Sequence, residues 1–228
     1  MRRSIARELM DGPVDDVDEL EANLRDIAFA NARLGGTAPV VRALQRIDSR
    51  RLEVLDVGSG AADIPLALVR DASRRGVELS VTCLDRSEHM LALARRATGD
   101  DPALSFVQAD GGALPYADGA FDVVICTLAL HHFDPGGARP LLRELRRVSR
   151  VTPVVCDLRR SELAFVATWL WSRTSRNRLT RHDAPLSVRR AYTPDEAVAL
   201  ARDAGWRMPR VQREPFFRMT LTDGASDE

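Results

Sequence analysis

The stretch VLDVGSGAADIP, residues 54–65, constrains the fold of this chain more than any other feature. An apolar, β-branched run comes first, Gly58 and Gly60 follow, and a segment with helical spacing begins after them. A buried strand that turns sharply into a helix is typical of α/β proteins, which bind nucleotide-like ligands at the carboxyl end of the strand. Glycines at such a turn let the backbone approach a ligand closely.

The alternation of strand and helix continues along the chain. Strands are predicted at 51–57, 78–85, 104–110, 121–130 and 151–158, and helices between them at 63–75, 87–97 and 138–149. This pattern predicts an α/β fold, a Rossmann-like, doubly wound and mainly parallel sheet with helices on both faces. Pro153 indicates an edge position or a bulge at the start of its strand. Two short runs on either side of Pro215 predict a terminal antiparallel strand pair.

Helical additions surround this core. Two helices, at 15–34 and about 38–48, come before the first strand, so we assign residues 1–48 to N-terminal lid helices. The main domain is predicted at 49–222, with a helical substrate cap inserted at about 160–190 and a disordered tail at 223–228. The cap consists of a helix at about 160–174 and an arginine-rich irregular stretch after it. Beyond the cap, a further helix is predicted at about 194–204.

Composition excludes several classes of protein. The 228 residues carry no net charge and no long basic run, which argues against a nucleic-acid partner. Three cysteines lie within apolar runs without metal-ligand spacing, so we expect no metal site and a reducing, cytoplasmic location. The N-terminus lacks the apolar segment of a signal peptide, and the apolar run at 163–171 is too short for stable membrane insertion.

Carboxylates around the glycine turn indicate the kind of ligand. A dinucleotide site favours a third glycine where this chain has Asp63, and Asp56 ends the strand before the turn. Two acids there would repel a diphosphate and suit a ligand with positive charge. Asp85, at the end of the second strand, is placed to accept hydrogen bonds from ribose hydroxyls, as it would be in either class. Asp110, at the end of the third strand, is placed to meet an adenine amino group.

Four longer motifs extend this pattern over roughly residues 52–157. They read VLDVGSG, LDRSEHMLALAR, FVQADGGALPYADGAFDVVICTLALHHF and LLRELRRV. Together they resemble the class I S-adenosylmethionine-dependent methyltransferases, and more loosely the small-molecule enzymes of ubiquinone and menaquinone biosynthesis. The resemblance implies S-adenosylmethionine as cofactor and S-adenosylhomocysteine as product. It also implies that residues 49–222 are the methyltransferase domain.

The resemblance assigns cofactor contacts to ten positions. They are Asp56, Gly58 and Gly60 along the methionine part, Asp85 at the ribose, Arg86, Met90, Asp110 and Gly111 around the adenine, and the backbone near Thr127 and Leu128 at the amino group. Two departures stand out. Ala62 replaces a glycine that many relatives have, and RVSRVTPVV replaces a Pro-Gly-Gly turn before the fifth strand.

Histidines supply the candidate catalytic groups. His131 and His132 follow the fourth strand at the carboxyl edge of the sheet, and His182 lies in the cap beside Asp183, which could orient it. Histidine titrates near neutral pH, so each is a candidate general base for a hydroxyl acceptor. The alternative for each is a packing role with hydrogen bonds to backbone. Asn31 or Arg33 is a further candidate for the cofactor carboxylate.

The acceptor is expected to be a small apolar or aromatic molecule: a phenol, a quinone-like ring or a polyketide. Aromatic residues in the lid and cap, namely Phe29, Phe165, Trp169 and Trp171, favour such a molecule over a sugar. TLALHHF stands where nucleic-acid amino methyltransferases carry an Asn/Asp-Pro-Pro-aromatic turn. We expect O-methylation by a monomer or homodimer. C-methylation, a non-catalytic protein that retains the cofactor, and a dinucleotide oxidoreductase remain the alternatives.

Overall fold

A computed structural model describes residues 1–12, 16–99 and 101–224. Its described residues form a seven-stranded sheet of order β3-β2-β1-β4-β5-β7-β6. The strands are β1 (Arg51–Val57), β2 (Glu78–Asp85), β3 (Leu104–Gln108), β4 (Phe121–Thr127), β5 (Ser149–Leu158), β6 (Pro209–Glu214) and β7 (Arg218–Asp223). Strands β1 to β5 pair in parallel, while β7 is antiparallel to both β5 and β6. The predicted Rossmann-like sheet with an antiparallel end is confirmed.

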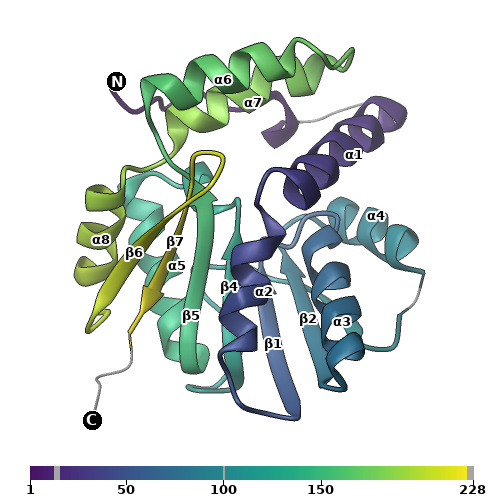
Figure 1. The fold of residues 1–228 in the computed structure, drawn as a ribbon, viewed down its shortest axis with the longest axis vertical. Coiled ribbons are helices and arrows are strands. Elements are labelled where there is room, and N and C mark those ends of the chain that lie inside the picture. Colours follow the sequence, from purple (N-terminus) through teal and green to yellow (C-terminus); the bar gives the residue numbers. More distant parts are fainter. Residues whose placement is uncertain (13–15, 100, 225–228) are drawn as a thin grey trace.

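Helices cover both faces of this sheet (Figure 1). They are α1 (Val17–Arg33), α2 (Thr37–Gln45), α3 (Asp63–Arg75), α4 (Glu88–Thr98), α5 (Pro135–Val148), α6 (Glu162–Ser172), α7 (Arg178–Arg190) and α8 (Pro194–Asp203), with short helices η1 (Leu9–Asp11) and η2 (Leu130–His132). Helices α2, α3 and α4 pack on one face, and α5 and α8 pack on the other.

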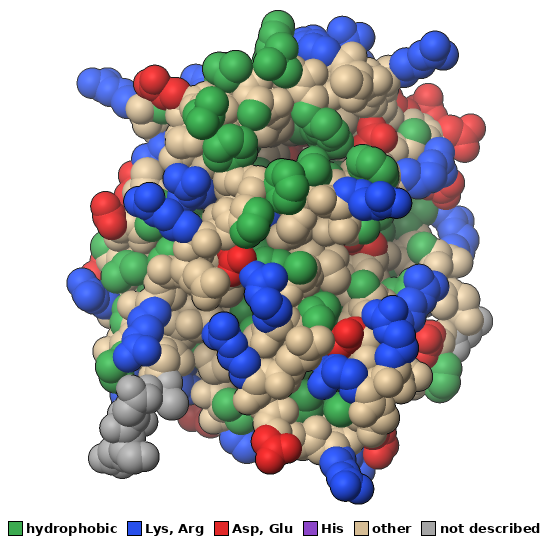
Figure 2. All heavy atoms as spheres, in the orientation of Figure 1, with side chains coloured by type: hydrophobic (Ala, Val, Ile, Leu, Met, Phe, Trp, Pro, Cys, Tyr) green, Lys and Arg blue, Asp and Glu red, His purple; other side chains and the backbone are tan. Residues whose placement is uncertain are grey.

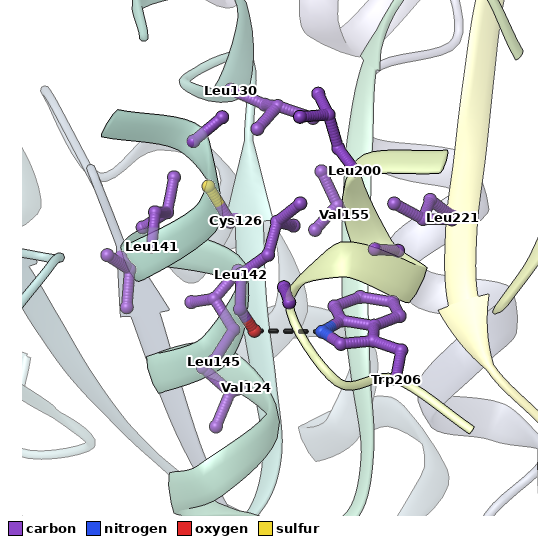
Figure 3. Packing of buried hydrophobic residues seen from close by; sticks show 14 of the residues in the cluster. Val124, Cys126, Leu130, Leu141, Leu142, Leu145, Val155, Leu200, Trp206 and Leu221 are labelled. Carbon is purple, nitrogen blue, oxygen red and sulfur yellow. Dashed lines mark hydrogen bonds between the residues drawn. The ribbon is translucent and has the colours of Figure 1, made fainter. Parts of the chain in front are cut away.

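The second face is held by a dense apolar cluster and one buried indole hydrogen bond (Figure 3). Leu141, Leu142 and Leu145 of α5 are fully buried against the strands. The Trp206 Nε1 donates to the Leu142 carbonyl oxygen at 2.8 Å, which satisfies the only polar group of a buried indole. This packing fixes the strands whose carboxyl ends carry the site described below.

Of two local predictions, an edge or a bulge at Pro153 is confirmed as a bulge, and the end of the fourth strand needs correction. Pro153 is not at a sheet edge, because β5 lies between β4 and β7. The bulge is present instead, since the β4–β5 register shifts between the Phe121 and Val123 pairings, just before Pro153. The fourth strand ends at Thr127 rather than at 130, because Leu128 adopts a positive φ of 54° that extended backbone does not allow.

The arginine-rich segment after α6 is helical, so its interpretation as an irregular stretch is wrong over 178–190. The Asn177 side chain caps α7 by accepting from the Thr180 amide, and the helix tolerates Pro185 inside it. Helix α7 packs against α6, α1, η1 and η2. These elements lie over the carboxyl ends of β1 and β4 (Figure 1).

The lid, cap and tail boundaries remain predictions. Residues 225–228 of the predicted tail lie outside the described residues, and Asp223 belongs to β7. In the described ranges no helix combines the length and hydropathy that crossing a bilayer requires.

Candidate cofactor and acceptor site

The turn after β1 is fixed by backbone geometry. Gly58 has a φ of +75°, and a Cβ atom there would lie 2.8 Å from the Ala129 Cβ, so only glycine fits without displacing the loop after β4. The Gly58 and Ser59 amides both donate to the Leu84 carbonyl oxygen, at 2.8 and 3.1 Å. The turn is therefore tied to the end of β2 and lies against the loop after β4.

Asp56 is a buried carboxylate at the end of β1. Its side chain is 2% exposed, and within the described residues its Oδ1 has no hydrogen-bond partner. Burial raises the pKa of Asp56 well above its usual value, and the negative charges of Asp63 and Asp85 raise it further. The buried hydroxyls of Ser59 and Thr127 also lack partners in the described part of the chain. Such atoms indicate a site made for a polar ligand, because leaving them unpaired is costly.

Asp85 organises the neighbouring turn. Its Oδ2 accepts from the Gly60 amide at 3.1 Å, and its Oδ1 accepts from the Ser87 amide at 2.9 Å. Each carboxylate oxygen can accept more than one hydrogen bond, so both remain able to receive a hydroxyl. Arg86 is exposed, and Met90 is half-buried, its Cε 3.9 Å from where a Cβ on Gly60 would lie.

The other assigned positions have clear structural roles of their own. The Asp110 Oδ1 accepts from the Gly112 amide at 2.8 Å, and its side chain is exposed two residues beyond β3. A Cβ on Gly111 would lie 2.9 Å from Val57 and 3.0 Å from Leu141, so packing alone requires glycine there. The Leu128 amide donates to the Cys156 carbonyl oxygen at 2.9 Å.

The Asp63 side chain accepts a hydrogen bond from helix α1. The Asn31 Nδ2 donates to the Asp63 Oδ2 at 3.0 Å, and burial raises the pKa of Asp63. Asn31 is thereby engaged within the protein, while Arg33 is exposed. The departure at Ala62 concerns backbone conformation more than helix packing, because this residue caps α3 with a left-handed φ of 57°.

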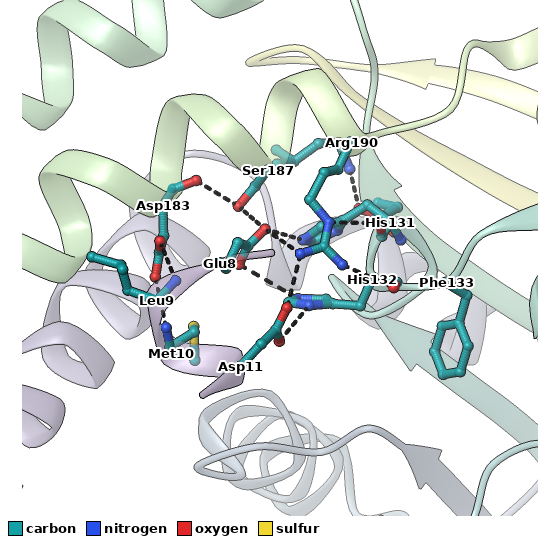
Figure 4. A network of polar contacts seen from close by, with 12 residues as sticks. Glu8, Leu9, Met10, Asp11, His131, His132, Phe133, Asp183, Ser187 and Arg190 are labelled. Carbon is teal, nitrogen blue, oxygen red and sulfur yellow. Dashed lines mark hydrogen bonds and ion pairs between the residues drawn. The ribbon is translucent and has the colours of Figure 1, made fainter. Parts of the chain in front are cut away.

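The two histidines of η2 each have a carboxylate partner, and both belong to a polar network with Glu8, Asp11 and Arg190 (Figure 4). The His131 Nδ1 lies 2.7 Å from the Asp157 Oδ1, and both residues are buried. The His132 Nδ1 lies 3.0 Å from the Asp11 Oδ1, and its side chain is 27% exposed. A carboxylate at Nδ1 fixes the ring and leaves Nε2 as the basic nitrogen. His132 is therefore the more accessible candidate base.

Glu8 faces both rings. Its oxygens lie 3.7 Å from the His131 Nε2 and 3.8 Å from the His132 Nε2, and burial raises the pKa of Glu8. One ligand atom from each of these three residues lies within 4.8 Å of the others, a grouping that sequence spacing did not predict. The Arg190 guanidinium lies 2.8 Å from Asp11 and 3.8 Å from Glu8, and its positive charge disfavours a cation there. We interpret the group as an ion-pair network.

His182 lies apart from this network. Its Nδ1 contacts the Asp183 Oδ1 at 2.7 Å, as the sequence suggested, and half of its side chain is exposed. It lines an open pocket between α6 and α7 rather than the cluster around Glu8. The aromatic residues of the lid and the cap are also exposed in part, with Phe29 of the lid at 56% and Trp169 of the cap at 41%.

Sequence reasoning missed four of the residues that build this region: Glu8, Asp11, Asp157 and Arg190. Asp157 carries the signal used for Asp56 and Asp85, an acid at the carboxyl end of a buried strand, and that signal could have identified it. Glu8 and Asp11 lie in an N-terminal segment without a motif. Only the folded chain brings that segment to η2 and α7.

Comparison with known proteins agrees with this geometry. Residues 54–151 match the family described as "Methyltransferase domain". A ubiquinone/menaquinone biosynthesis C-methyltransferase of Rickettsia akari is 38% identical over 82 residues, which cover 35% of this chain and 33% of that protein. A demethylmenaquinone methyltransferase of Thermus thermophilus is 35% identical over 92 residues, 40% of this chain and 39% of that protein. The matches span about a third of the length of these relatives.

Solved structures share the fold over most of the chain. An S-adenosylmethionine-dependent methyltransferase from Aquifex aeolicus aligns with a TM-score of 0.65 and 17% identity, covering 91% of this chain and 98% of that one. PigF with bound S-adenosylhomocysteine aligns with a TM-score of 0.59 and 18% identity, covering 82% of this chain and 55% of that one.

Fold, glycine turn and strand-end carboxylates together define an α/β protein whose described residues include unpaired polar groups at the carboxyl edge of its parallel strands. Residues 54–151 match the methyltransferase-domain family, and the fold is shared with the class of S-adenosylmethionine-dependent methyltransferases. Over part of its length the chain is similar to ubiquinone/menaquinone biosynthesis C-methyltransferases. S-adenosylmethionine is the cofactor of the class.

Proposed function

We propose that this protein transfers a methyl group from S-adenosylmethionine to a hydroxyl of a small apolar or aromatic acceptor. The observation that carries the proposal is the buried Asp56 carboxylate: among the described residues its Oδ1 has no partner, and the charges that act on it, Asp63 and Asp85, are negative. The cofactor supplies an activated methyl group on a positively charged sulfur. A buried carboxylate suits that cation and would repel a diphosphate.

The chain's own residues divide the task. Asp56, Ser59 and Thr127 hold the polar methionine end, Gly58 and Gly60 allow close backbone approach, and Asp85 accepts from the ribose. Arg86, Met90, Asp110 and Gly111 frame the adenine. Positioning of this kind contributes roughly 7–11 kcal/mol to a transfer reaction.

His132 is the proposed base. Asp11 orients its Nδ1, its Nε2 is left to accept a proton from the acceptor hydroxyl, and a Glu8 oxygen lies 3.8 Å from that nitrogen. His131 positions this loop through Asp157. Removing a phenolic proton activates both the oxygen and the adjacent ring carbon. The C-methyltransferase names of the curated relatives therefore favour C-methylation as a second candidate.

The experiment is a transfer assay with isotopically labelled methyl donor and a panel of phenols and quinols, read by NMR of the products. Label on oxygen supports the main proposal, and label on carbon supports the second candidate. The protein could instead bind the cofactor and label no product, even when the panel includes small molecules extracted from the cells that produce the protein. That result would favour a non-catalytic binding protein and contradict both O- and C-methylation.

Asp85→Ala is expected to weaken binding of S-adenosylmethionine by about 1.5–3 kcal/mol, roughly 10- to 100-fold. The variant loses charge-assisted acceptors for the ribose and also frees the Gly60 amide. Calorimetric titration measures the affinity, with Asp118→Ala as control because the Asp118 side chain is 82% exposed. Unchanged affinity in a folded Asp85 variant would remove it from the ribose site.

His132→Asn is expected to lower turnover by about 10²–10⁴-fold while leaving cofactor affinity within twofold. The sequence also predicts that His182→Ala lowers turnover more than cofactor affinity. Because His182 lies outside the Glu8 cluster, we expect its effect to be the smaller one. Steady-state kinetics of the two variants compare the candidates. If only His182→Ala impairs the rate, the base is His182.

A further inference from the structure

Helix α6 presents an apolar stripe to solvent. Leu163 is 68% exposed, Val166 50%, Trp169 41% and Leu170 58%, and their spacing places them on one face of the helix. Figure 2 shows hydrophobic side chains gathered at the top of the molecule, where Figure 1 places α6. Scattered exposed leucines are ordinary, but four large apolar residues in one stripe indicate a surface that something covers.

Helix α7 and the turn before it present arginines beside that stripe. Residues 159–190 contain eight arginines and two acidic residues, although the whole chain is neutral. Five arginines line the pocket between α6 and α7: Arg173, Arg176, Arg178, Arg181 and Arg189. Arg178 is paired with Glu19 at 2.9 Å. Among the described residues, no acidic side chain lies within 4.0 Å of the other four guanidinium groups.

The pocket joins the two kinds of surface. Its volume is about 670 Å³, it contains no acidic side chain in its lining, and Phe165 and Leu186 form its apolar wall. The Arg173 guanidinium stacks over the Trp169 ring at 4.9 Å, where basic and apolar surfaces meet. A phospholipid presents the same pairing, an anionic phosphate next to acyl chains. Helices that rest on membranes use apolar residues with tryptophan on one side and arginine on the other.

We propose that the α6–α7 face binds the surface of a bilayer containing anionic phospholipids, without spanning it. Each arginine near such a surface adds to the attraction, and the α6 stripe dips below the head groups. A second copy of this chain is disfavoured as the occupant, because two such faces would bring their arginines together. The bilayer is favoured over an acidic protein because three of the four residues in the α6 stripe, Leu163, Val166 and Leu170, are aliphatic and offer no hydrogen-bonding group.

Sedimentation with vesicles tests the proposal without cofactor or acceptor, so its failure is distinct from failure of methyl transfer. The protein is expected to pellet with phosphatidylcholine–phosphatidylglycerol vesicles and to stay in solution with phosphatidylcholine alone. Raising the salt concentration should reduce binding to the anionic vesicles. The Arg176→Glu/Arg181→Glu and Leu163→Ser/Leu170→Ser variants should each lose at least about tenfold in apparent affinity.

Matched controls carry the same changes elsewhere. Arg46→Glu/Arg50→Glu reverses two exposed charges near the amino end of β1, far from α6 in Figure 1, and Val151→Ser changes an apolar residue that is 50% exposed. Both should retain vesicle binding, and thermal melting should show all variants folded. Equal binding to neutral and anionic vesicles, or equal loss in the controls, would overturn the proposal. Absence of vesicle binding would also overturn the proposal. The face would then be occupied by a second copy if light scattering shows a dimer through the α6 stripe, or by an acidic protein if one binds instead.

Discussion

Asp56→Asn is expected to make the unliganded protein more stable and its binding of S-adenosylmethionine weaker. The wild-type carboxylate is buried, and its Oδ1 has no partner among the described residues. Asparagine keeps the shape and removes the buried charge, so the free energy of unfolding should rise by about 1–3 kcal/mol. The same change should weaken cofactor binding roughly 10- to 100-fold, because a charge-assisted contact to the cationic ligand is lost.

The pH dependence gives this prediction a sign. Burial, with the charges of Asp63 and Asp85, raises the pKa of Asp56 in the folded protein. The destabilisation by Asp56 is therefore absent below the unfolded pKa of about 3.9, grows as pH rises towards the folded pKa, and is complete above it. The stability gain of the variant should grow over the same range. Urea unfolding and calorimetry measure both quantities, with Asp118→Asn as control. A less stable variant with unchanged affinity would contradict the assignment.

Asp157→Ala is expected to lower the free energy of unfolding by about 3–5 kcal/mol. Asp157 is 1% exposed and accepts from the His131 ring at 2.7 Å, from the His131 amide at 2.9 Å and from the Leu158 amide. Alanine leaves two buried donors of His131 and the part-buried Leu158 amide without this acceptor, so the cost is larger than for a surface ion pair. Asp118→Ala, which removes an exposed partner of Arg147, should cost at most about 1 kcal/mol.

Lowering the pH should reduce the difference in the free energy of unfolding between the wild type and Asp157→Ala. Burial alone would raise the pKa of Asp157, but the charge and hydrogen bond of His131 and two backbone amides hold it below its ordinary value. The stabilisation by Asp157 is thus present above the unfolded pKa and lost as pH falls through the folded pKa. Urea unfolding at neutral and acid pH checks this, and equal stability of the two proteins at neutral pH would show that the buried pair is dispensable.

The core fold was predictable because each strand of the parallel sheet has a clear local pattern. The runs at 51–57 and 78–85 coincide with β1 and β2, and the acids that end them lie at the same sheet edge. The bulge before Pro153 was also indicated by the sequence, because a proline inside a strand is typical of an edge or a bulge. The end of β4 was not predictable, since nothing in the apolar TLAL sequence signals the positive φ of Leu128.

The acceptor side was less predictable because its residues converge only through tertiary structure. Glu8 and Asp11 reach His131 and His132 from a segment without periodicity, and Arg190 reaches them from α7. Among the arginines that suggested an irregular stretch, Arg178, Arg181 and Arg189 are exposed on α7, and the helical spacing of the buried residues of α7 decides the structure. The high arginine content of the segment does not by itself reveal the helical spacing of its buried residues.

Calorimetric titration of the intact chain with S-adenosylmethionine, S-adenosylhomocysteine and reduced nicotinamide dinucleotide tests the central assignment most directly. A nucleoside site framed by strand-end carboxylates should bind one equivalent of either of the first two ligands. Asp56→Asn should weaken the binding of S-adenosylmethionine more than that of S-adenosylhomocysteine. Heat from the nicotinamide alone, or from none of the three, would refute the assignment.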